Sequence, residues 1–169
     1  MVDSADVKQL LSRFEDLPRF QDGRIDYTHA DSAAVVNCFV MHDGRLLLLK
    51  RSDQVMVYPG KWNVVGGFLD EAVSVKQKVC EELSEELGIE KASIDRVEEH
   101  EMFEYGDRTA SRTWFIFPTV VTLNSPDITL DWEHTEYRWI QPGEISKFDI
   151  VPGLDRLAAR VLVSQTSHS

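Results

Sequence analysis

A glycine pair, Gly66-Gly67, stands a few residues ahead of a segment in which apolar residues recur at every fourth position. Such a period is typical of a helix that packs one face on a core, and Gly88 stands where a left-handed residue often ends a helix. The short apolar run 62–65 before the glycine pair has strand character. We therefore predict a strand ending at Gly66-Gly67, a short loop, and a helix over residues 72–87. The apolar positions of this helix are Val75, Val79, Leu83 and Leu87.

Strand-like runs lie on both sides of this helix. Residues 34–41 and 45–51 surround an Asp-Gly turn, a strong hairpin signal. An apolar stripe over residues 154–162 predicts a second helix near the end of the chain. Strands before and after a central helix, with another helix following, predict an α/β fold whose mixed sheet is covered on both faces. The later strand-like runs lie within residues 96–105, 113–123 and 128–140.

The chain has 169 residues, which suits one domain with a substantial core. We assign residues 1–30 to an N-terminal extension and residues 31–165 to the domain itself. The extension contains one short amphipathic helix, because apolar residues recur there at helical spacing. The residues of this helical face are Val7, Leu10, Leu11 and Phe14.

The charge balance and the cysteines narrow the partners and the compartment. With 18 basic and 29 acidic residues the net charge is -11, so phosphate backbones are repelled and no nucleic-acid partner is expected. No apolar run approaches the roughly 20 residues of a membrane helix, so no membrane association is expected. Cys38 and Cys80 form neither a C-x-x-C pair nor a zinc-ligand cluster, and the N-terminal residues have no basic segment followed by an apolar one. We therefore expect reduced thiols and a cytoplasmic location.

The central helix carries four glutamates on neighbouring positions, namely Glu81, Glu82, Glu85 and Glu86. Like charges about 6 Å apart repel by about 3 kcal/mol at an effective dielectric of 20, so something is expected to offset the repulsion. One interpretation is a solvated acidic helix face. The other is a site where carboxylates and a backbone carbonyl near the glycine pair converge on one cation. Oxygen ligands of this kind suit Mg²⁺ or Mn²⁺.

These residues resemble the Nudix family, whose signature is G-x5-E-x7-R-E-U-x-E-E-x-G-U with U aliphatic. Two positions depart from it, because Val73 stands in place of the first Glu and Glu81 in place of the Arg. In the family these two residues form an ion pair beside the metal site, and Asp70 and Glu71 are candidates to substitute for the missing carboxylate here. The matching positions are Gly67, Glu82, Leu83, Glu85, Glu86, Gly88 and Ile89.

The resemblance implies a Nudix-type α/β/α sandwich and a phosphoanhydride hydrolase. Its reaction would be the Mg²⁺-dependent cleavage of a nucleoside diphosphate linked to another moiety, such as a nucleotide, a dinucleotide or a nucleotide sugar. The implied ligands of Mg²⁺, or of Mn²⁺, are the Gly66 carbonyl and the carboxylates of Glu82, Glu85 and Glu86. Glu82 is the favoured general base.

The resemblance implies further site residues outside the signature. Glu133 is a candidate to complete the metal or base set, with an exposed turn carboxylate as the alternative. Arg51, Lys61 and Arg112 are candidates for contact with the substrate phosphates. His134 has no second histidine at metal spacing, so we interpret it as a structural or surface residue.

Two other functions compete with hydrolysis. Val73 and Glu81 favour a catalytically reduced Nudix domain that binds a nucleotide as a regulatory module. Isopentenyl diphosphate isomerase, a Nudix relative, needs a cysteine and a histidine near the strand end, and residues 62–69 contain neither. The identity of the nucleotide and the formation of a homodimer are left open by the sequence.

Overall fold

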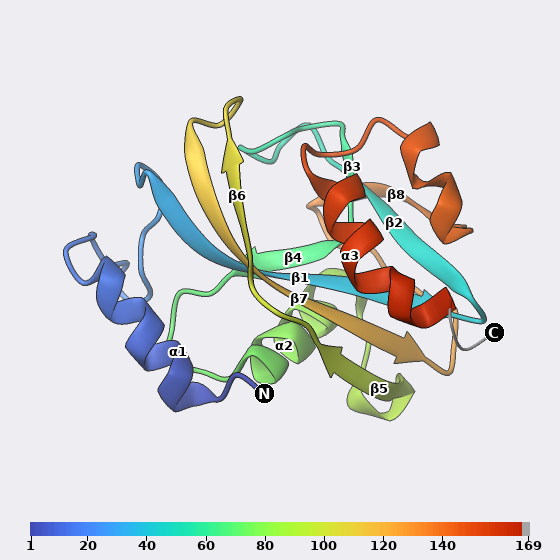
Figure 1. The fold of residues 1–169 in the computed structure, drawn as a ribbon, viewed down its shortest axis with the longest axis horizontal. Helices are drawn as coiled ribbons and strands as arrows, with labels where there is room; N and C mark the ends of the chain where they lie inside the picture. Colours follow the sequence, from blue (N-terminus) through green and yellow to red (C-terminus); the bar gives the residue numbers. More distant parts are fainter. Residues whose placement is uncertain (167–169) are drawn as a thin grey trace.

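The computed structural model describes residues 1–166, in which eight strands form one mixed sheet (Figure 1). Its central order is β3-β2-β1-β7-β5, and β4, β6 and β8 pair with β1, β7 and β2. Strands β1 and β7 are parallel, whereas the other pairs are antiparallel. The strands are β1 Ser32–His42, β2 Arg45–Arg51, β3 Trp62–Asn63, β4 Val65–Phe68, β5 Ile94–Glu99, β6 Phe103–Asp107, β7 Arg112–Leu123 and β8 His134–Ile140.

Helices cover both faces of this sheet. Alternate residues of β1 point to opposite sides: Val36 and Cys38 pack in one core with α2, while Phe39 and Met41 pack in a second core with α3. This arrangement confirms the predicted α/β sandwich with a mixed sheet. No described helix is long and apolar enough to cross a bilayer. The α-helices are α1 Ser4–Leu11, α2 Val75–Leu87 and α3 Leu154–Thr166, and the short 3-10 helices are η1 Ser12–Phe14, η2 Lys91–Ser93 and η3 Pro142–Lys147.

Helix α2 begins three residues later than predicted. The Ser74 side chain accepts a hydrogen bond from the Gln77 amide, so this residue caps the helix and fixes its start. Gly88 ends the helix in the left-handed conformation, with φ of 65°. The four predicted apolar positions are all buried, which confirms the face of the helix that meets the sheet.

The predicted strand over residues 62–65 is divided between two strands, β3 and β4, and its predicted end at the glycine pair was wrong. Trp62 and Asn63 pair with β2, whereas Gly66 and Gly67 pair with Asn37 and Val36 of β1. The chain thus changes partner strand near Val64, and the glycine pair lies inside β4 rather than after a strand.

The predicted run 128–140 forms a strand only from residue 134. The amides of Thr129 and Asp131 instead donate to the carbonyls of Leu87 and Glu86 at 3.0 and 3.2 Å. These bonds satisfy carbonyl groups in the last turn of α2 and hold the following residues beside that end of the helix.

The N-terminal segment packs on the α2 side of the sheet. Val7, Leu11 and Phe14 belong to the same core cluster as α2, as the helical spacing predicted. The Phe14 ring meets Tyr27 edge to face, and Tyr27 in turn stacks on Phe68 of β4 with 5.3 Å between ring centroids. The division of the chain at residue 30 stays a prediction.

Candidate active site

Helix α2 and strand β4 bring two glutamates into the interior. Glu86 is 3% exposed, and Glu82, one turn earlier, is also largely covered. Glu85 is exposed at the helix surface but lines the same cavity as Glu82. The acidic face is therefore not simply a solvated one, because two of its carboxylates are directed into the protein.

Gly67 is required by the position of the Glu82 side chain. A Cβ atom on this residue would lie 2.4 Å from Oε1 of Glu82, a separation that real Cβ atoms do not adopt. The absence of a side chain lets the Glu82 carboxylate lie directly against the backbone of β4. Gly66 lines the same cavity, so its carbonyl remains a candidate ligand.

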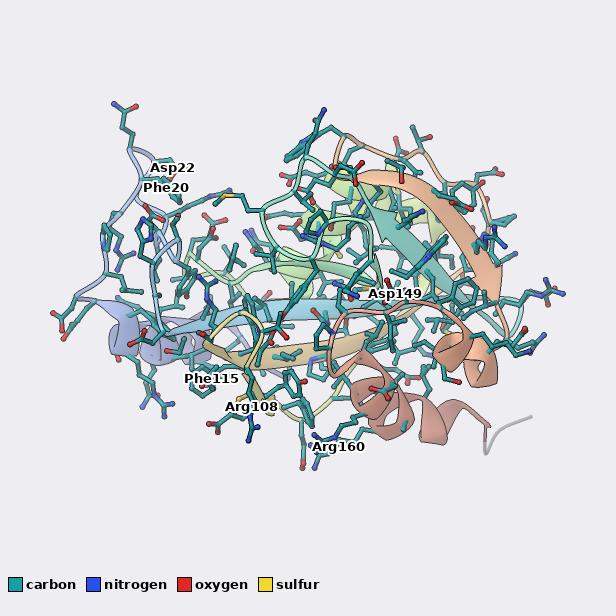
Figure 2. All side chains as sticks on the ribbon, turned by 90° about the horizontal axis from the view of Figure 1, so that it is seen from above. Phe20, Asp22, Arg108, Phe115, Asp149 and Arg160 are labelled. Atoms are coloured by element: carbon teal, nitrogen blue, oxygen red, sulfur yellow. The ribbon has the colours of Figure 1, made fainter. Side chains whose placement is uncertain are left out.

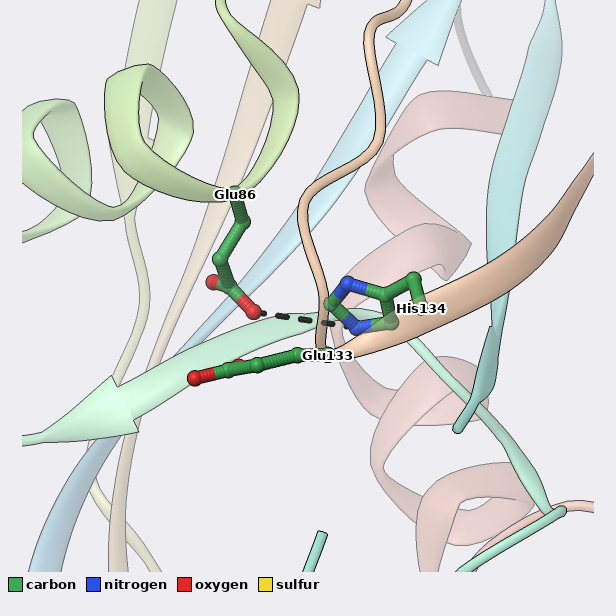
Figure 3. Close-up of side chains that lie close together, drawn as sticks. All are labelled: Glu86, Glu133 and His134. Atoms are coloured by element: carbon green, nitrogen blue, oxygen red, sulfur yellow. Dashed lines mark ion pairs between the residues drawn. The ribbon is translucent and has the colours of Figure 1, made fainter. Parts of the chain in front are cut away.

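The loop before β8 supplies two more side chains to this place. An oxygen of Glu133 and a ring nitrogen of His134 lie within 4.8 Å of each other and of an oxygen of Glu86 (Figure 3). His134 is buried, so it is not the surface residue that the sequence suggested as one alternative. Its position beside Glu86 could not be predicted, because nothing local in the sequence indicates that residues 129–131 bind the end of α2.

Burial perturbs the acidity of these carboxylates. Burial, reinforced by Glu82 and Glu133, raises the pKa of Glu86 to about 10. Burial raises the pKa of Glu82 to about 7, although Lys78 acts in the opposite direction. Burial and the nearby Asp131 also raise the pKa of Glu133. The carboxyl groups of Glu82, Glu86 and Glu133 thus lie together at one largely buried site, where a bound cation would favour their ionised form.

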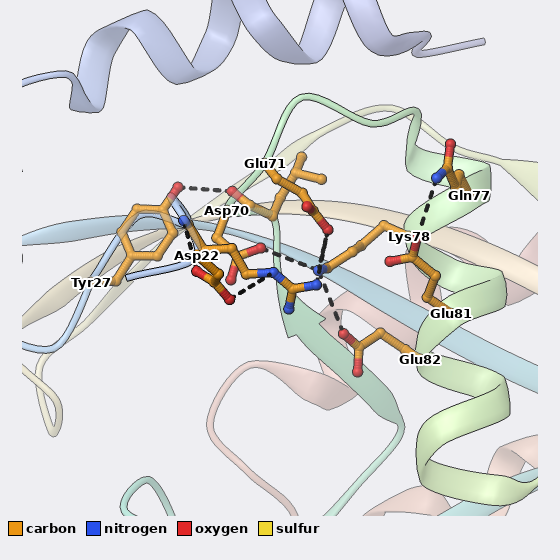
Figure 4. Close-up of polar contacts among 10 residues, drawn as sticks. Asp22, Tyr27, Asp70, Glu71, Gln77, Lys78, Glu81 and Glu82 are labelled. Carbon is orange, nitrogen blue, oxygen red and sulfur yellow. Dashed lines mark hydrogen bonds and ion pairs between the residues drawn. The ribbon is translucent and has the colours of Figure 1, made fainter. Parts of the chain in front are cut away.

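Lys78 is a site residue that sequence reasoning missed. Its side chain is 2% exposed, and Nζ lies 3.2 Å from Asp70, 3.6 Å from Glu71 and 3.9 Å from Glu82 (Figure 4). Arg24 also pairs with Glu71, at 3.2 Å. The spacing of Lys78 four residues ahead of Glu82 was a signal, because such residues face each other on a helix.

Neither of the two departures from the signature places an unpaired charge in the interior of the described site. Glu81 accepts a hydrogen bond from Gln77 at 3.2 Å and lies outside the cavity lining. Val73 is half-buried at the loop before α2. The ion pair expected at these positions is replaced by one between Lys78 and Asp70, so the carboxylate that the sequence suggested as a substitute has a buried cation beside it.

The three basic candidates are placed differently. Arg51 lines the cavity, and its Nε donates to the Val57 carbonyl at 2.7 Å. Lys61 instead pairs with Asp149 at 2.8 Å. Asp149, labelled in Figure 2, lies on the loop before α3. Arg112 donates to the carbonyls of Tyr27 and of the next residue and lies outside the cavity lining. The structure therefore brings Arg51 to the carboxylates but not Lys61 or Arg112.

A cavity of about 450 Å³ connects these carboxylates to a group of aromatic rings. Phe68, Tyr105 and Trp114 line it, with Phe68 and Trp114 tilted by 31° at a centroid distance of 6.3 Å. The indole of Trp114 is held by a hydrogen bond to Asp107 at 3.2 Å. Flat apolar surfaces of this kind suit the stacking of a planar heterocycle.

The fold and the site are those of an α/β/α sandwich in which acidic side chains of one helix meet at the end of a cavity. A family model described as the NUDIX domain matches residues 30–161. The chain therefore belongs to the Nudix hydrolase family, and the resemblance carried by its signature is confirmed.

Relatives and solved structures agree with this membership. The nucleoside triphosphatase NudI of Escherichia fergusonii is 24% identical over 123 residues, which cover 69% of this chain and 86% of the relative. An Ap4A hydrolase of C. elegans, solved as a binary complex, has a TM-score of 0.64 at 19% identity, with 80% of this chain and 98% of that chain covered. The NUDIX domain of Shewanella oneidensis NrtR, complexed with ADP ribose, has a TM-score of 0.63 at 18% identity, with 76% and 86% covered. These likenesses establish the fold.

Proposed function

We propose that this chain is a Mg²⁺-dependent pyrophosphohydrolase that cleaves a nucleoside diphosphate linked to another moiety. The observation that carries the proposal is a cavity lined by Glu82, Glu85 and Glu133 and also by aromatic rings, with the buried Glu86 in one cluster with Glu133. A phosphate chain at the carboxylate end and a base against the rings would use both halves of this cavity.

The residues present fit a divalent cation. Oε2 of Glu86 is buried and has no hydrogen-bond partner among the described residues, and a Cβ on Gly67 would fill the space that Glu82 occupies. Glu82, Glu85 and Glu86, with the Gly66 carbonyl, would hold Mg²⁺ or Mn²⁺, both of which prefer oxygen ligands. When bound, such an ion supplies charge neutralisation for the phosphates and lowers the pKa of a coordinated water.

The chain's own residues would bind and orient the substrate. Arg51 lines the carboxylate end of the cavity, where a guanidinium can donate two hydrogen bonds to a phosphate. Phe68 and Trp114 would hold the base by stacking. Glu82, which lines the cavity beside the backbone of β4, would accept the proton of the attacking water.

Nucleoside triphosphates are the substrates to test first. The NudI relative is named a nucleoside triphosphatase, and the C. elegans neighbour is named an Ap4A hydrolase. The test is a panel of nucleoside triphosphates, dinucleoside polyphosphates, ADP-ribose and nucleotide sugars, each assayed with Mg²⁺ and with EDTA. We expect Mg²⁺-dependent cleavage of at least one nucleotide and none in EDTA. Equal rates in both conditions would contradict the proposed metal dependence.

A nucleotide-binding module with reduced catalysis is the second candidate. Val73 and Glu81 depart from the signature, and the NrtR domain was solved with ADP ribose. Calorimetric binding of a panel nucleotide without any turnover would favour this function. A cytoplasmic location remains a prediction, which the unpaired thiols of Cys38 and Cys80 support.

A further inference from the structure

We propose that His134 supplies a nitrogen ligand to a divalent-cation site that it shares with Glu86 and Glu133. The inference deepens the proposed function, and it rests on the expectation that a cation enters this carboxylate cluster. Its starting point is that one atom from each residue lies within 4.8 Å of the other two (Figure 3). The three side chains come from the last turn of α2 and from the junction between the loop and β8.

The imidazole is held in one orientation by Asp131. Nδ1 of His134 lies 3.3 Å from Oδ1 of Asp131, and a carboxylate at that position can only accept a hydrogen from the ring. This contact favours the tautomer with the proton on Nδ1 and the lone pair on Nε2. A carboxylate that fixes a histidine tautomer in this way is a common support for histidine ligands.

Nε2, the ring nitrogen of His134 that does not contact Asp131, faces the buried carboxyl group of Glu86. Nε2 of His134 lies 3.7 Å from Oε1 of Glu86, and the two side chains are 1% and 4% exposed. Nε2, like Oε2 of Glu86, has no hydrogen-bond partner among the described residues. Two buried polar groups thus face each other at a separation too long for a hydrogen bond, and a cation between them would satisfy both.

The spacing suits one shared ion. Ligand atoms at roughly 2.1 Å from the same metal lie at most about 4.2 Å apart, so the 3.7 Å separation of Nε2 and Oε1 needs little adjustment. Glu133 adds a carboxylate at a distance that a rotation of its side chain can shorten. A site with one imidazole and two carboxylates favours Mn²⁺, Co²⁺ or Zn²⁺ over Mg²⁺.

The bond from nitrogen to metal can be detected without measuring catalysis. Mn²⁺ added in one equivalent to the wild-type protein should show a ¹⁴N imidazole coupling in pulsed electron paramagnetic resonance. Labelling the protein with ¹⁵N-histidine should replace that signal by a ¹⁵N coupling. His134→Gln should abolish the coupling and weaken Mn²⁺ binding by about tenfold, whereas His29→Gln, on an exposed loop histidine, should change neither.

The possible results separate this inference from the proposed function. Absence of Mn²⁺ binding, absence of nitrogen coupling in the wild type, or a coupling that persists in His134→Gln overturns the assignment. The labelling experiment uses only the wild-type protein, so it decides the matter even if His134→Gln fails to fold. Hydrolysis with Mg²⁺ in the absence of any nitrogen coupling would refute the histidine ligand while leaving the proposed hydrolase intact. Coupling without hydrolysis would support the ligand and count against the hydrolase.

Discussion

Replacing Lys78 by methionine should destabilise the protein substantially. Its Nζ lies 3.2 Å from Asp70, where the attraction is about 5 kcal/mol at an effective dielectric of 20, before the desolvation cost is subtracted. Breaking a buried pair typically costs 3–5 kcal/mol, because the remaining charge has lost its partner. Asp70 keeps 13% exposure and Glu71 keeps 33%, so water can partly solvate them. We therefore expect the lower end of that range, about 3 kcal/mol.

Thermal and denaturant unfolding measure this loss. For a domain of this size, about 3 kcal/mol corresponds to a melting temperature roughly 6–12 °C lower. Lys76→Met, on an exposed position of the same helix, is the matched control and should stay within about 0.5 kcal/mol of the wild type. The double variant Lys78→Met with Asp70→Asn should recover part of the loss, because no charge is then left unpaired.

The same substitution should change catalysis. Lys78 opposes the rise in the pKa of Glu82 caused by burial, so its removal raises that pKa further. The acidic limb of the pH-rate profile should then move to higher pH. A Lys78→Met protein as stable as Lys76→Met, or additive effects of Lys78→Met and Asp70→Asn, would refute the reasoning.

Three other changes test the site. Gly67→Ala should displace the Glu82 side chain, because a Cβ would lie 2.4 Å from its Oε1. Mg²⁺-dependent hydrolysis should then fall by at least tenfold, and activity equal to the wild type would contradict the close packing. Glu86 and Glu82 bind protons more tightly in the folded state than in the unfolded state, so in EDTA the free energy of unfolding should fall as pH rises from about 5 to 8. Each of these two carboxyl groups contributes a fall of up to about 1.4 kcal/mol per pH unit. Calorimetry that shows rising stability would contradict the raised pKa values. The double variant Val73→Glu with Glu81→Arg should raise turnover, since it restores the ion pair of the signature and Glu81 lies outside the cavity lining. Abolished turnover, measured with the best panel substrate, would instead indicate that Glu81 is a ligand or a base.

The layers of the fold could be predicted because they depend on local patterns. The stripe of Val75, Val79, Leu83 and Leu87 identified α2 and its buried face, and the hairpin turn identified β1 and β2. The end of the strand at the glycine pair could not be predicted correctly. Sequence patterns do not show that the chain changes partner strand near Val64.

The glutamates on α2 could be predicted in the same way, but their partners could not. Lys78 becomes a site residue only because the loop after β4 brings Asp70 to it. His134 becomes one only because the amide of Asp131 binds a carbonyl at the end of α2. Both contacts join segments that are remote or separated by a loop, and no periodic pattern encodes them.

The central claim is tested most directly by the products formed from a nucleoside triphosphate in Mg²⁺. We predict release of nucleoside monophosphate by the wild type, and a loss of at least a hundredfold in Glu86→Gln, whose carboxylate is buried in the cluster. Glu81→Gln, on the same helix but outside the cluster of Glu86, Glu133 and His134, should retain nearly full release. Equal release by the wild type and Glu86→Gln would contradict the account.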